Sequence, residues 1–443
     1  MRLNRILPGL SAAALVLIVV VAGFAWFWRS DEPQPFMIAA ANPYASEAGA
    51  AMLRKGGSAV DAAIAVQAVL SLVEPESSGL AGGAFMLHYD EKSGDVAAYD
   101  GRETAPMGAT PALFLDDEGE PLPFLEAMIG GSSVGTPGVV KMLWLAHEEY
   151  GKLEWAELFQ PAIKLAEGGF TVAPKLAEAI ARDPVLMQMP VAQDYFYRVN
   201  AEGMRVPAAE GDVLKNPAYA ETLKIIAAKG WKGFYEGPVA EEIVTTVQNA
   251  PRRPGTLALS DFASYEAKKR EPVCAAYRDY RVCSMPPPTS GGLTTLQILG
   301  ILGNYDLKGM GPMTLTAVHF IAEAEKLAYA DRDKYIGDPD FVDVPVDEML
   351  DSAYLESRAN EIDASYSMGK AEPGRLADER AMNWGMNQPV AMPPTSHSSI
   401  LDSHGNVLSL TTSVEGPSAS HLMAGGMMPT YQPTDTAFAP AQD

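Results

Sequence analysis

The sequence predicts a globular domain of mixed helix and strand, in the α/β or α+β class. Of its 443 residues, 47% are hydrophobic and 20% are charged, which is the balance of a chain that buries a core. Stretches with the apolar spacing of helices are interspersed with short runs of strand-like composition, and no repeat or low-complexity tract interrupts them. The mixed order leaves α/β and α+β both open and favours one continuous domain after the N-terminal segment.

The N-terminal segment is predicted to be a membrane anchor. Arg2 and Arg5 precede an uncharged stretch at residues 10–28, which Arg29 ends. As a helix this stretch would be about 28 Å long, close to the roughly 30 Å of a bilayer's hydrocarbon core. A cleaved signal peptide is the alternative, although its apolar region is usually shorter. The positive-inside rule then places the rest of the chain outside the cytoplasm, in the periplasm or extracellular space.

The first two helices of the domain are predicted from apolar spacing and end signals. One covers residues 44–55 and stops at Gly56-Gly57; the next begins at Ser58, with Asp61 three residues on as in a capping box. Their small residues predict a closely packed helix pair. Further helices are expected at residues 139–150, 155–167, 218–229 and 317–335.

Strands are predicted at residues 85–89, 96–99, 280–284, 398–402 and 407–413. The last two flank His404-Gly405-Asn406 and predict a hairpin. If Arg278-Asp279 is a two-residue turn, residues whose numbers sum to 557 lie opposite each other, so Cys274 faces Cys283. A disulfide is feasible in an oxidising compartment, and two idle thiols are the alternative.

The formal net charge of −23 excludes nucleic acid as a natural partner, because such a chain repels phosphate. A carboxylate substrate would need a locally positive site, for which one arginine suffices. The six histidines are scattered, and Asp338-Pro339-Asp340 is typical of a turn rather than a cation site. We therefore expect no metal and no cofactor.

Three patterns offer a nucleophile. Gly131-Ser132-Ser133-Val134-Gly135 fits the nucleophile-elbow template at Ser133, but no clean strand precedes it and the next helix is delayed. His397 lies two residues from Thr395 on the same strand face, as in a hydroxyl–histidine pair. Thr395 could also act alone if a cut exposed it as a new N-terminus, because its own α-amine would then be the base. Residues 380–394 before it have the character of an extended loop, where a cut is tolerable.

The surroundings of Thr395 resemble the start of the catalytic small chain of γ-glutamyltransferases (γ-glutamyl transpeptidases). The resemblance begins with Thr395-Ser396-His397-Ser398-Ser399 and extends in order over residue 37 to the end. The other matching segments are residues 56–63, 74–79, 82–85, 100–106, 135–138, 285–292, 323–326 and 337–341. Each of these motifs taken alone is common in loops, but the ordered set is very specific.

The resemblance implies an N-terminal-nucleophile hydrolase fold, a four-layer αββα sandwich, made as a precursor that cuts itself between Pro394 and Thr395. Residues 1–36 would be anchor and linker, 37–394 the large chain and 395–443 the start of the small chain. Thr395 would then hold the γ-glutamyl group of glutathione or a similar compound as an ester and pass it to water, an amino acid or a peptide.

Further site residues follow from the same resemblance. Arg102 corresponds to the arginine that binds the substrate α-carboxylate, for which a guanidinium fork is the chemical match; a surface pair with Asp100 or Glu103 is the alternative. Ser413 corresponds to a hydroxyl that assists the threonine. Glu415, Gln432 and Asp435 correspond to groups near the substrate amine.

The sequence also departs from the family pattern. Pro429-Thr430-Tyr431 replaces a Leu-Asn-Asn run, and Pro433 is inserted before Asp435. A small chain of residues 395–443 would end before the family's Ser-Ser pair and Gly-Gly oxyanion hole, so the sequence suggests a C-terminally truncated member. Two alternatives therefore stay open: a related side-chain amide acylase, and a membrane-tethered inactive pseudoenzyme that binds γ-glutamyl ligands.

Overall fold

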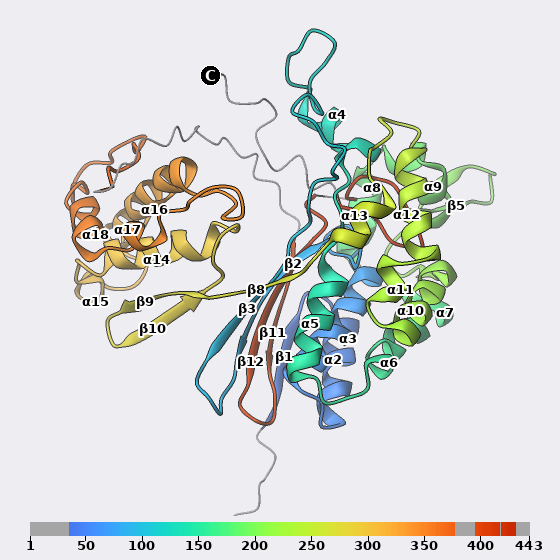
Figure 1. Cartoon of the computed structure of the whole chain (residues 1–443), viewed down its shortest axis with the longest axis horizontal. Helices are drawn as coiled ribbons and strands as arrows, with labels where there is room; N and C mark the ends of the chain where they lie inside the picture. Colours follow the sequence, from blue (N-terminus) through green and yellow to red (C-terminus); the bar gives the residue numbers. More distant parts are fainter. Residues whose placement is uncertain (1–34, 377–394, 417, 431–443) are drawn as a thin grey trace, which may run out of the picture.

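The computed structural model describes residues 35–376, 395–416 and 418–430. They form a main body around one large sheet and a smaller lobe beside it (Figure 1). The predicted anchor at residues 10–28, the loop at 380–394, Gln432 and Asp435 lie outside the described residues. Among the helices that the described residues form, none has both the length and the apolar character to cross a bilayer.

The central sheet has six strands in the order β1-β11-β12-β2-β3-β8, and every neighbouring pair is antiparallel. It brings the hairpin near the end of the chain between strands from its beginning. The strands are β1 (Met37–Ala40), β2 (Gly83–Tyr89), β3 (Val96–Gly101), β8 (Lys268–Arg270), β11 (Thr395–Leu401) and β12 (Val407–Ser413). Burial alternates along β11 and β12, as expected when one sheet face packs on a core.

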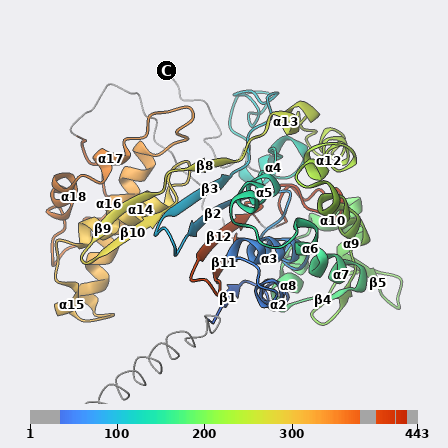
Figure 2. The same ribbon diagram turned by 60° about the horizontal axis from the view of Figure 1, so that its bottom comes forward.

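Helices cover one face of this sheet, as the two views in Figures 1 and 2 show. They are α2 (Pro43–Arg54), α3 (Ala59–Val73) and α5 (Val139–Tyr150). Every residue of α3 is buried, and its alanines let it lie against α2 and against strands β11 and β12. Ser58 and Asp61 form the predicted capping box at its start. The predicted α2–α3 pair is thus confirmed.

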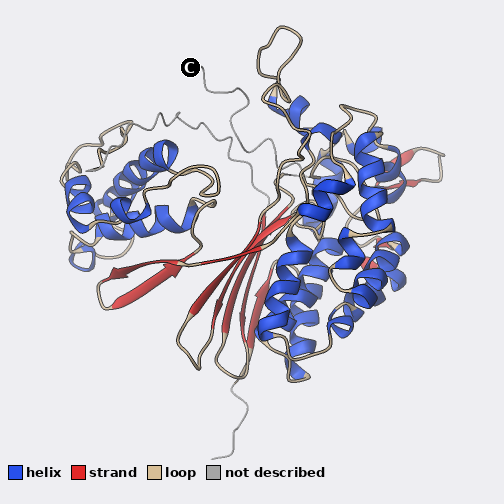
Figure 3. Ribbon diagram, viewed as in Figure 1, coloured by secondary structure: helices blue, strands red, loops and turns tan. Residues whose placement is uncertain are grey.

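A wider helical region extends the main body (Figure 3). Its helices are α4 (Phe124–Met128), α6 (Trp155–Leu158), α7 (Gln160–Gly168), α8 (Pro174–Arg182), α9 (Pro190–Phe196), α10 (Pro217–Lys229), α11 (Lys232–Tyr235), α12 (Pro238–Gln248) and α13 (Leu259–Ser264). Two 3₁₀ turns, η1 (Gly131–Ser133) and η2 (Leu186–Gln188), and the short pairs β4 (Phe170–Thr171) with β7 (Val213–Leu214) and β5 (Tyr197–Val199) with β6 (Arg205–Pro207) complete it. The single helix predicted at 155–167 is divided at Phe159, because Pro161 cannot continue a helix but can begin one.

The smaller lobe has apolar clusters of its own, a division that the sequence pattern did not predict. It consists of the hairpin β9 (Val273–Tyr277) and β10 (Tyr280–Ser284) with helices α14 (Gly291–Leu302), α15 (Leu307–Met310), α16 (Leu315–Tyr335), α17 (Val346–Met349) and α18 (Ser352–Ala359). Cys274 lies opposite Cys283 in the hairpin and the two form a disulfide. The predicted register is confirmed, and the idle-thiol alternative is wrong.

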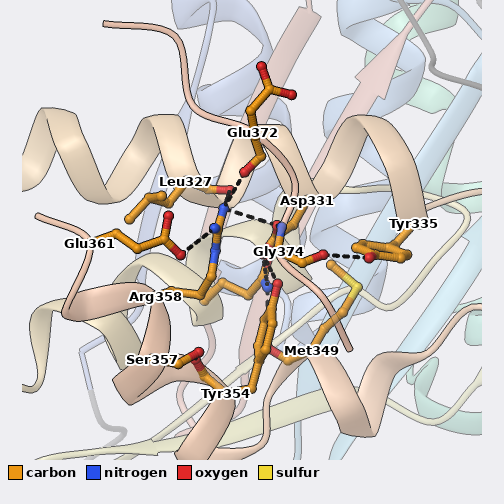
Figure 4. A network of polar contacts seen from close by, with 11 residues as sticks. Leu327, Asp331, Tyr335, Met349, Tyr354, Ser357, Arg358, Glu361, Glu372 and Gly374 are labelled. Atoms are coloured by element: carbon orange, nitrogen blue, oxygen red, sulfur yellow. Dashed lines mark hydrogen bonds and ion pairs between the residues drawn. The ribbon is translucent and has the colours of Figure 1, made fainter. Parts of the chain in front are cut away.

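A buried polar network in this lobe holds the last described residues before position 377 (Figure 4). Asp331, which is fully buried, accepts hydrogen bonds from the Tyr354 hydroxyl at 2.7 Å and the Gly374 amide at 2.8 Å. Arg358 pairs with Asp331 at 3.2 Å and donates to the Glu372 carbonyl at 2.9 Å. Buried polar groups whose hydrogen bonds are satisfied favour one arrangement, so the network ties Glu372 and Gly374 to α16 and α18.

The mixed α/β (α+β) class is confirmed. The resemblance implied four layers. In the main body the described residues form one helix layer and the six-stranded sheet, and in the smaller lobe they form the hairpin β9–β10 with its helices.

Candidate active site

Thr395 lies at one end of the central sheet, where four of the site's chain segments meet. It is the first residue of β11 and lies opposite Ser413, the last residue of β12. Ser413 in turn lies opposite Gly83, the first residue of β2, whose neighbour Ala84 faces Gly101 at the end of β3. Arg102 follows directly. The antiparallel order therefore gathers Thr395, Ser413 and Arg102 at the same end of the strands, and the Thr395 side chain is exposed there.

Arg102 forms a partly buried ion pair with Glu415, which follows β12. The Arg102 Nη1 to Glu415 Oε1 distance is 2.6 Å, and the two side chains are 27% and 11% exposed. The guanidinium lies 5.9 Å from the Phe85 ring centroid, so it reaches back over β2 toward the Thr395 side of the sheet. This pair joins the Arg102 side chain to a residue far along the chain, whereas the alternative from the sequence was a pair with Asp100 or Glu103.

The backbone of Arg102 is fixed by groups on both sides. Its N–H donates to Asp100 Oδ1 at 2.8 Å, while Asp100 Oδ2 accepts from Arg270 of β8 at 2.7 Å. The Tyr265 hydroxyl donates to the Arg102 carbonyl at 2.7 Å. Burial, followed by the nearby phenol of Tyr235 and carboxylates, raises the pKa of Tyr265 well above its usual range, so the phenol remains a proton donor. Sequence reasoning missed Tyr265 and Arg270 because no local pattern marks them.

Glycines allow the chain segments to approach one another at this end of the sheet. A Cβ added to Gly82 would lie 2.3 Å from the Ser413 carbonyl oxygen, and one at Gly138 would lie 2.2 Å from the Gly101 carbonyl oxygen. Neither position could hold a side chain without moving backbone. The motifs at residues 82–85 and 135–138 therefore keep Ser413 and the Arg102 strand close together.

Glu415 is held in an uncommon backbone conformation. Its φ is +77°, in the left-handed region, and its N–H donates to Ser413 Oγ at 2.8 Å. This hydrogen bond couples the orientation of Glu415 to the Ser413 hydroxyl beside Thr395.

The two other candidate nucleophile arrangements take different roles. Ser133 is fully buried in η1, and its Oγ donates to the Met128 carbonyl at 2.6 Å, so the elbow interpretation is wrong. His397 lies on the same face as Thr395, as predicted, but its ring nitrogens contact Thr411 Oγ1 at 2.9 Å and Ser399 Oγ at 3.2 Å. Within the described part of the chain, no cluster of three potential metal-ligating side chains occurs.

A buried pair of carboxylates lies in the turn that leads into β2. Glu74 and Glu76 share the ammonium of Lys175, at 2.7 and 3.4 Å, and the turn continues to Gly79, next to Val414. Burial, and next the Glu74 charge, raise the pKa of Glu76 to about 7 despite Lys175.

The raised pKa of Glu76 predicts a pH-dependent stability. Because the folded-state pKa lies above the unfolded value, the folded state binds this proton more tightly, and the free energy of unfolding falls as pH rises from about 5 to about 8. We expect Glu76→Gln to stabilise the protein by about 1–3 kcal/mol at pH 8 and by little at pH 5. Urea unfolding at both values would measure it, with Glu47→Gln, an exposed change, as the control. An equal effect at both pH values would contradict the prediction.

Known proteins match this chain over most of its length. The profile of the Gamma-glutamyltranspeptidase family matches residues 45–436. A glutathione hydrolase proenzyme of Bacillus subtilis is 38% identical over 384 residues, which are 86% of this chain. The chain spans 64% of the length of that relative.

Solved structures give the same picture. The crystal structure of Helicobacter pylori gamma-glutamyltranspeptidase is 34% identical with a TM-score of 0.73, over 78% of this chain and 97% of that one. A cephalosporin acylase from Bacillus halodurans is 29% identical with a TM-score of 0.73, over 91% of this chain and 70% of that one. With a family match over residues 45–436, and Thr395, Ser413 and Arg102 gathered at one end of the central sheet, the chain belongs to the gamma-glutamyltranspeptidase family.

Proposed function

We propose that the chain is the precursor of a γ-glutamyl hydrolase and transferase that acts on glutathione or similar γ-glutamyl compounds. The observation that supports this most is the position of Thr395, exposed at the end of β11 and level with Ser413, on the side to which the Arg102 guanidinium reaches. The names of relatives support the same class, since they are glutathione hydrolase proenzymes.

In the proposed reaction, a cut between Pro394 and Thr395 gives Thr395 a free α-amine. This amine takes the proton of the Thr395 hydroxyl while Oγ1 attacks the γ-carbonyl carbon of the substrate. The amide bond breaks, its nitrogen leaves as an amine with the transferred proton, and the γ-glutamyl group remains as an ester. Water or the amine of an amino acid or peptide then attacks the ester and regenerates Thr395. Ser413 would hydrogen-bond the threonine.

The ion pair between Arg102 and Glu415 supports recognition of a zwitterionic head group. An α-carboxylate carries the charge of Glu415, and an α-ammonium carries the charge of Arg102, so a γ-glutamyl substrate can replace each partner with its own group. In this arrangement Arg102 binds the carboxylate and Glu415 the ammonium. Gln432 and Asp435 are proposed to add to the ammonium site.

A side-chain amide acylase is the second candidate, favoured by the similarity to a cephalosporin acylase. It would keep the threonine chemistry but accept acyl groups without the α-ammonium. Glu415 argues for a γ-glutamyl substrate. Once a substrate carboxylate occupies Arg102, the Glu415 carboxylate, which is 11% exposed, needs another cation, and the α-ammonium supplies it.

The direct test combines intact mass with two donors. After incubation of residues 30–443, mass spectrometry in denaturing solvent should show two species divided between Pro394 and Thr395. The mature protein should turn over γ-glutamyl-p-nitroanilide at least about tenfold faster than glutaryl-p-nitroanilide, which differs only in lacking the α-amino group; one lost charge-assisted hydrogen bond accounts for that factor. Faster turnover of the glutaryl compound would favour the acylase, and binding without turnover the pseudoenzyme.

We also propose that residues 10–28 anchor the protein, with residues 37 onward outside the cytoplasm. The uncharged stretch and its flanking arginines support the anchor, and the Cys274–Cys283 disulfide supports an oxidising compartment. Release of the full chain from membranes by alkaline carbonate would contradict the anchor.

A further inference from the structure

We propose that a buried hydrogen bond between His421 and Asp183 positions Glu415 for binding the substrate ammonium. The inference rests on the proposed function, in which Glu415 receives that ammonium. Asp183 follows helix α8 of the large-chain region, whereas His421 belongs to the segment after Thr395, so the pair would join the two chains of the mature protein.

The segment that follows Glu415 has an unusual backbone. Like Glu415, residues Ser418, Ala419 and His421 have positive φ values, of +62°, +50° and +64°. Residues other than glycine seldom adopt this region, and they stay there only when surrounding contacts hold them. The carboxylate of Glu415 therefore depends on whatever fixes this segment.

Asp183 supplies the main side-chain contact of the segment. His421 Nε2 lies 2.8 Å from Asp183 Oδ2, and the His421 and Asp183 side chains are 3% and 12% exposed. The other oxygen of this carboxylate accepts the Val185 amide at 3.0 Å. Burial alone would raise the pKa of Asp183, but these hydrogen bonds and the His421 charge outweigh it and lower the pKa. The acceptor is thus an ionised carboxylate.

Backbone contacts hold the same segment from its other side. The Gly130 amide donates to the Ser420 carbonyl at 3.1 Å, and Ser420 Oγ donates to the Pro429 carbonyl at 2.8 Å. The Ala419 amide donates to the Gly416 carbonyl at 2.9 Å and the His421 amide to the Ser418 carbonyl at 2.8 Å, so backbone turns carry the left-handed path. Asp183 adds the side-chain contact that holds His421 at the end of these turns. Loss of that contact would let the turns relax and move Glu415 away from Arg102.

The test measures equilibrium binding, so it does not depend on turnover. Calorimetry on the full chain gives the Kd of L-glutamate and of glutarate, which lacks only the α-amino group. We expect Asp183→Asn and His421→Phe to raise the Kd of L-glutamate about tenfold, the scale of one weakened charge-assisted contact. The Kd of glutarate should stay within about twofold, because glutarate presents no ammonium to Glu415.

Two matched variants serve as controls. His421→Gln keeps an N–H donor at the reach of Nε2. Asp212→Asn alters a carboxylate that, like Asp183, accepts hydrogen bonds from a side chain and a backbone amide, here of Arg198 and Ala209, but does not contact the segment. Both should bind L-glutamate like the wild type, and the His421→Phe and His421→Gln pair decides the matter if Asp183→Asn does not fold.

The outcomes separate the inference from the function beneath it. If the wild type binds L-glutamate no better than glutarate, the ammonium role of Glu415 fails and the inference fails with it. If the wild type prefers L-glutamate and the Asp183→Asn and His421→Phe variants keep that preference, only the inference is overturned. A loss of both ligands would show a general structural role and would also overturn it.

Discussion

Replacing Thr395 by alanine is expected to leave the chain uncut and to lower turnover of γ-glutamyl-p-nitroanilide by a factor on the order of 10⁴–10⁶, the scale seen when a hydrolase loses its nucleophile. Both effects have one cause, because the same hydroxyl attacks the peptide bond before it and later the substrate. Intact mass in denaturing solvent would measure the first effect, and initial rates the second.

Thr411→Ala is the matched control for this change. Thr411 is an exposed threonine on the same sheet face, one strand over, where it contacts His397 and lies two residues before Ser413. Its loss should leave cutting complete and rates within about threefold, as expected for an exposed hydrogen bond. Thr395→Ser should still cut, because it keeps a hydroxyl that can attack the carbonyl of the peptide bond before it. Two chains in Thr395→Ala, or an uncut Thr411→Ala, would refute the assignment of Thr395.

Elements with strong local signals could be predicted from the sequence. Helix α5 begins and ends where apolar spacing placed it, and α3 starts at the predicted Ser58 cap. The hairpin β11–β12 turns at the predicted His404-Gly405-Asn406, where Asp402 accepts the amides of His404 and Asn406. In each case the residues that determine the structure are adjacent in sequence.

The elements that were missed depend on distant partners. Strands β1 and β8 are only four and three residues long and exist because they pair with β11 and β3 at the two sheet edges. Their sequences carry too few residues for a period of two to be recognised. The break between α6 and α7 shows the reverse case, in which one proline overrides a helical apolar pattern.

The candidate site divides in the same way. Thr395, Ser413 and Arg102 could be named because each lies in a short motif of the resembled family. The pairing of Arg102 with Glu415 could not, because it joins the ends of two strands and requires a left-handed residue at Glu415. Tyr265 and Arg270 act on Arg102 only through the folded chain, so one sequence read alone gives no sign of them.

Replacing Arg102 by alanine is expected to lower kcat/KM for γ-glutamyl-p-nitroanilide by about 10²–10³, mainly through KM. A guanidinium and a carboxylate form two charge-assisted hydrogen bonds, and their loss accounts for about 3–4 kcal/mol. Arg102→Lys should recover only part of this, since an ammonium keeps the charge but lacks the fork. Initial rates over a range of donor concentrations would separate KM from kcat.

A donor without the α-carboxylate distinguishes a binding role for Arg102 from a structural one. 4-Aminobutanoyl-p-nitroanilide keeps the ammonium and the scissile amide, so its turnover should hardly change in Arg102→Ala if the arginine binds only the carboxylate. The pairing with Glu415 adds a second consequence. In Arg102→Ala the Glu415 carboxylate, which is only 11% exposed, loses the contact with Arg102, so the fold is expected to be less stable. Arg198→Ala, which breaks a more exposed pair with Asp212, controls for the loss of an arginine. An equal fall in rate for both donors would mean that Arg102 supports the site's structure and that the carboxylate is bound elsewhere.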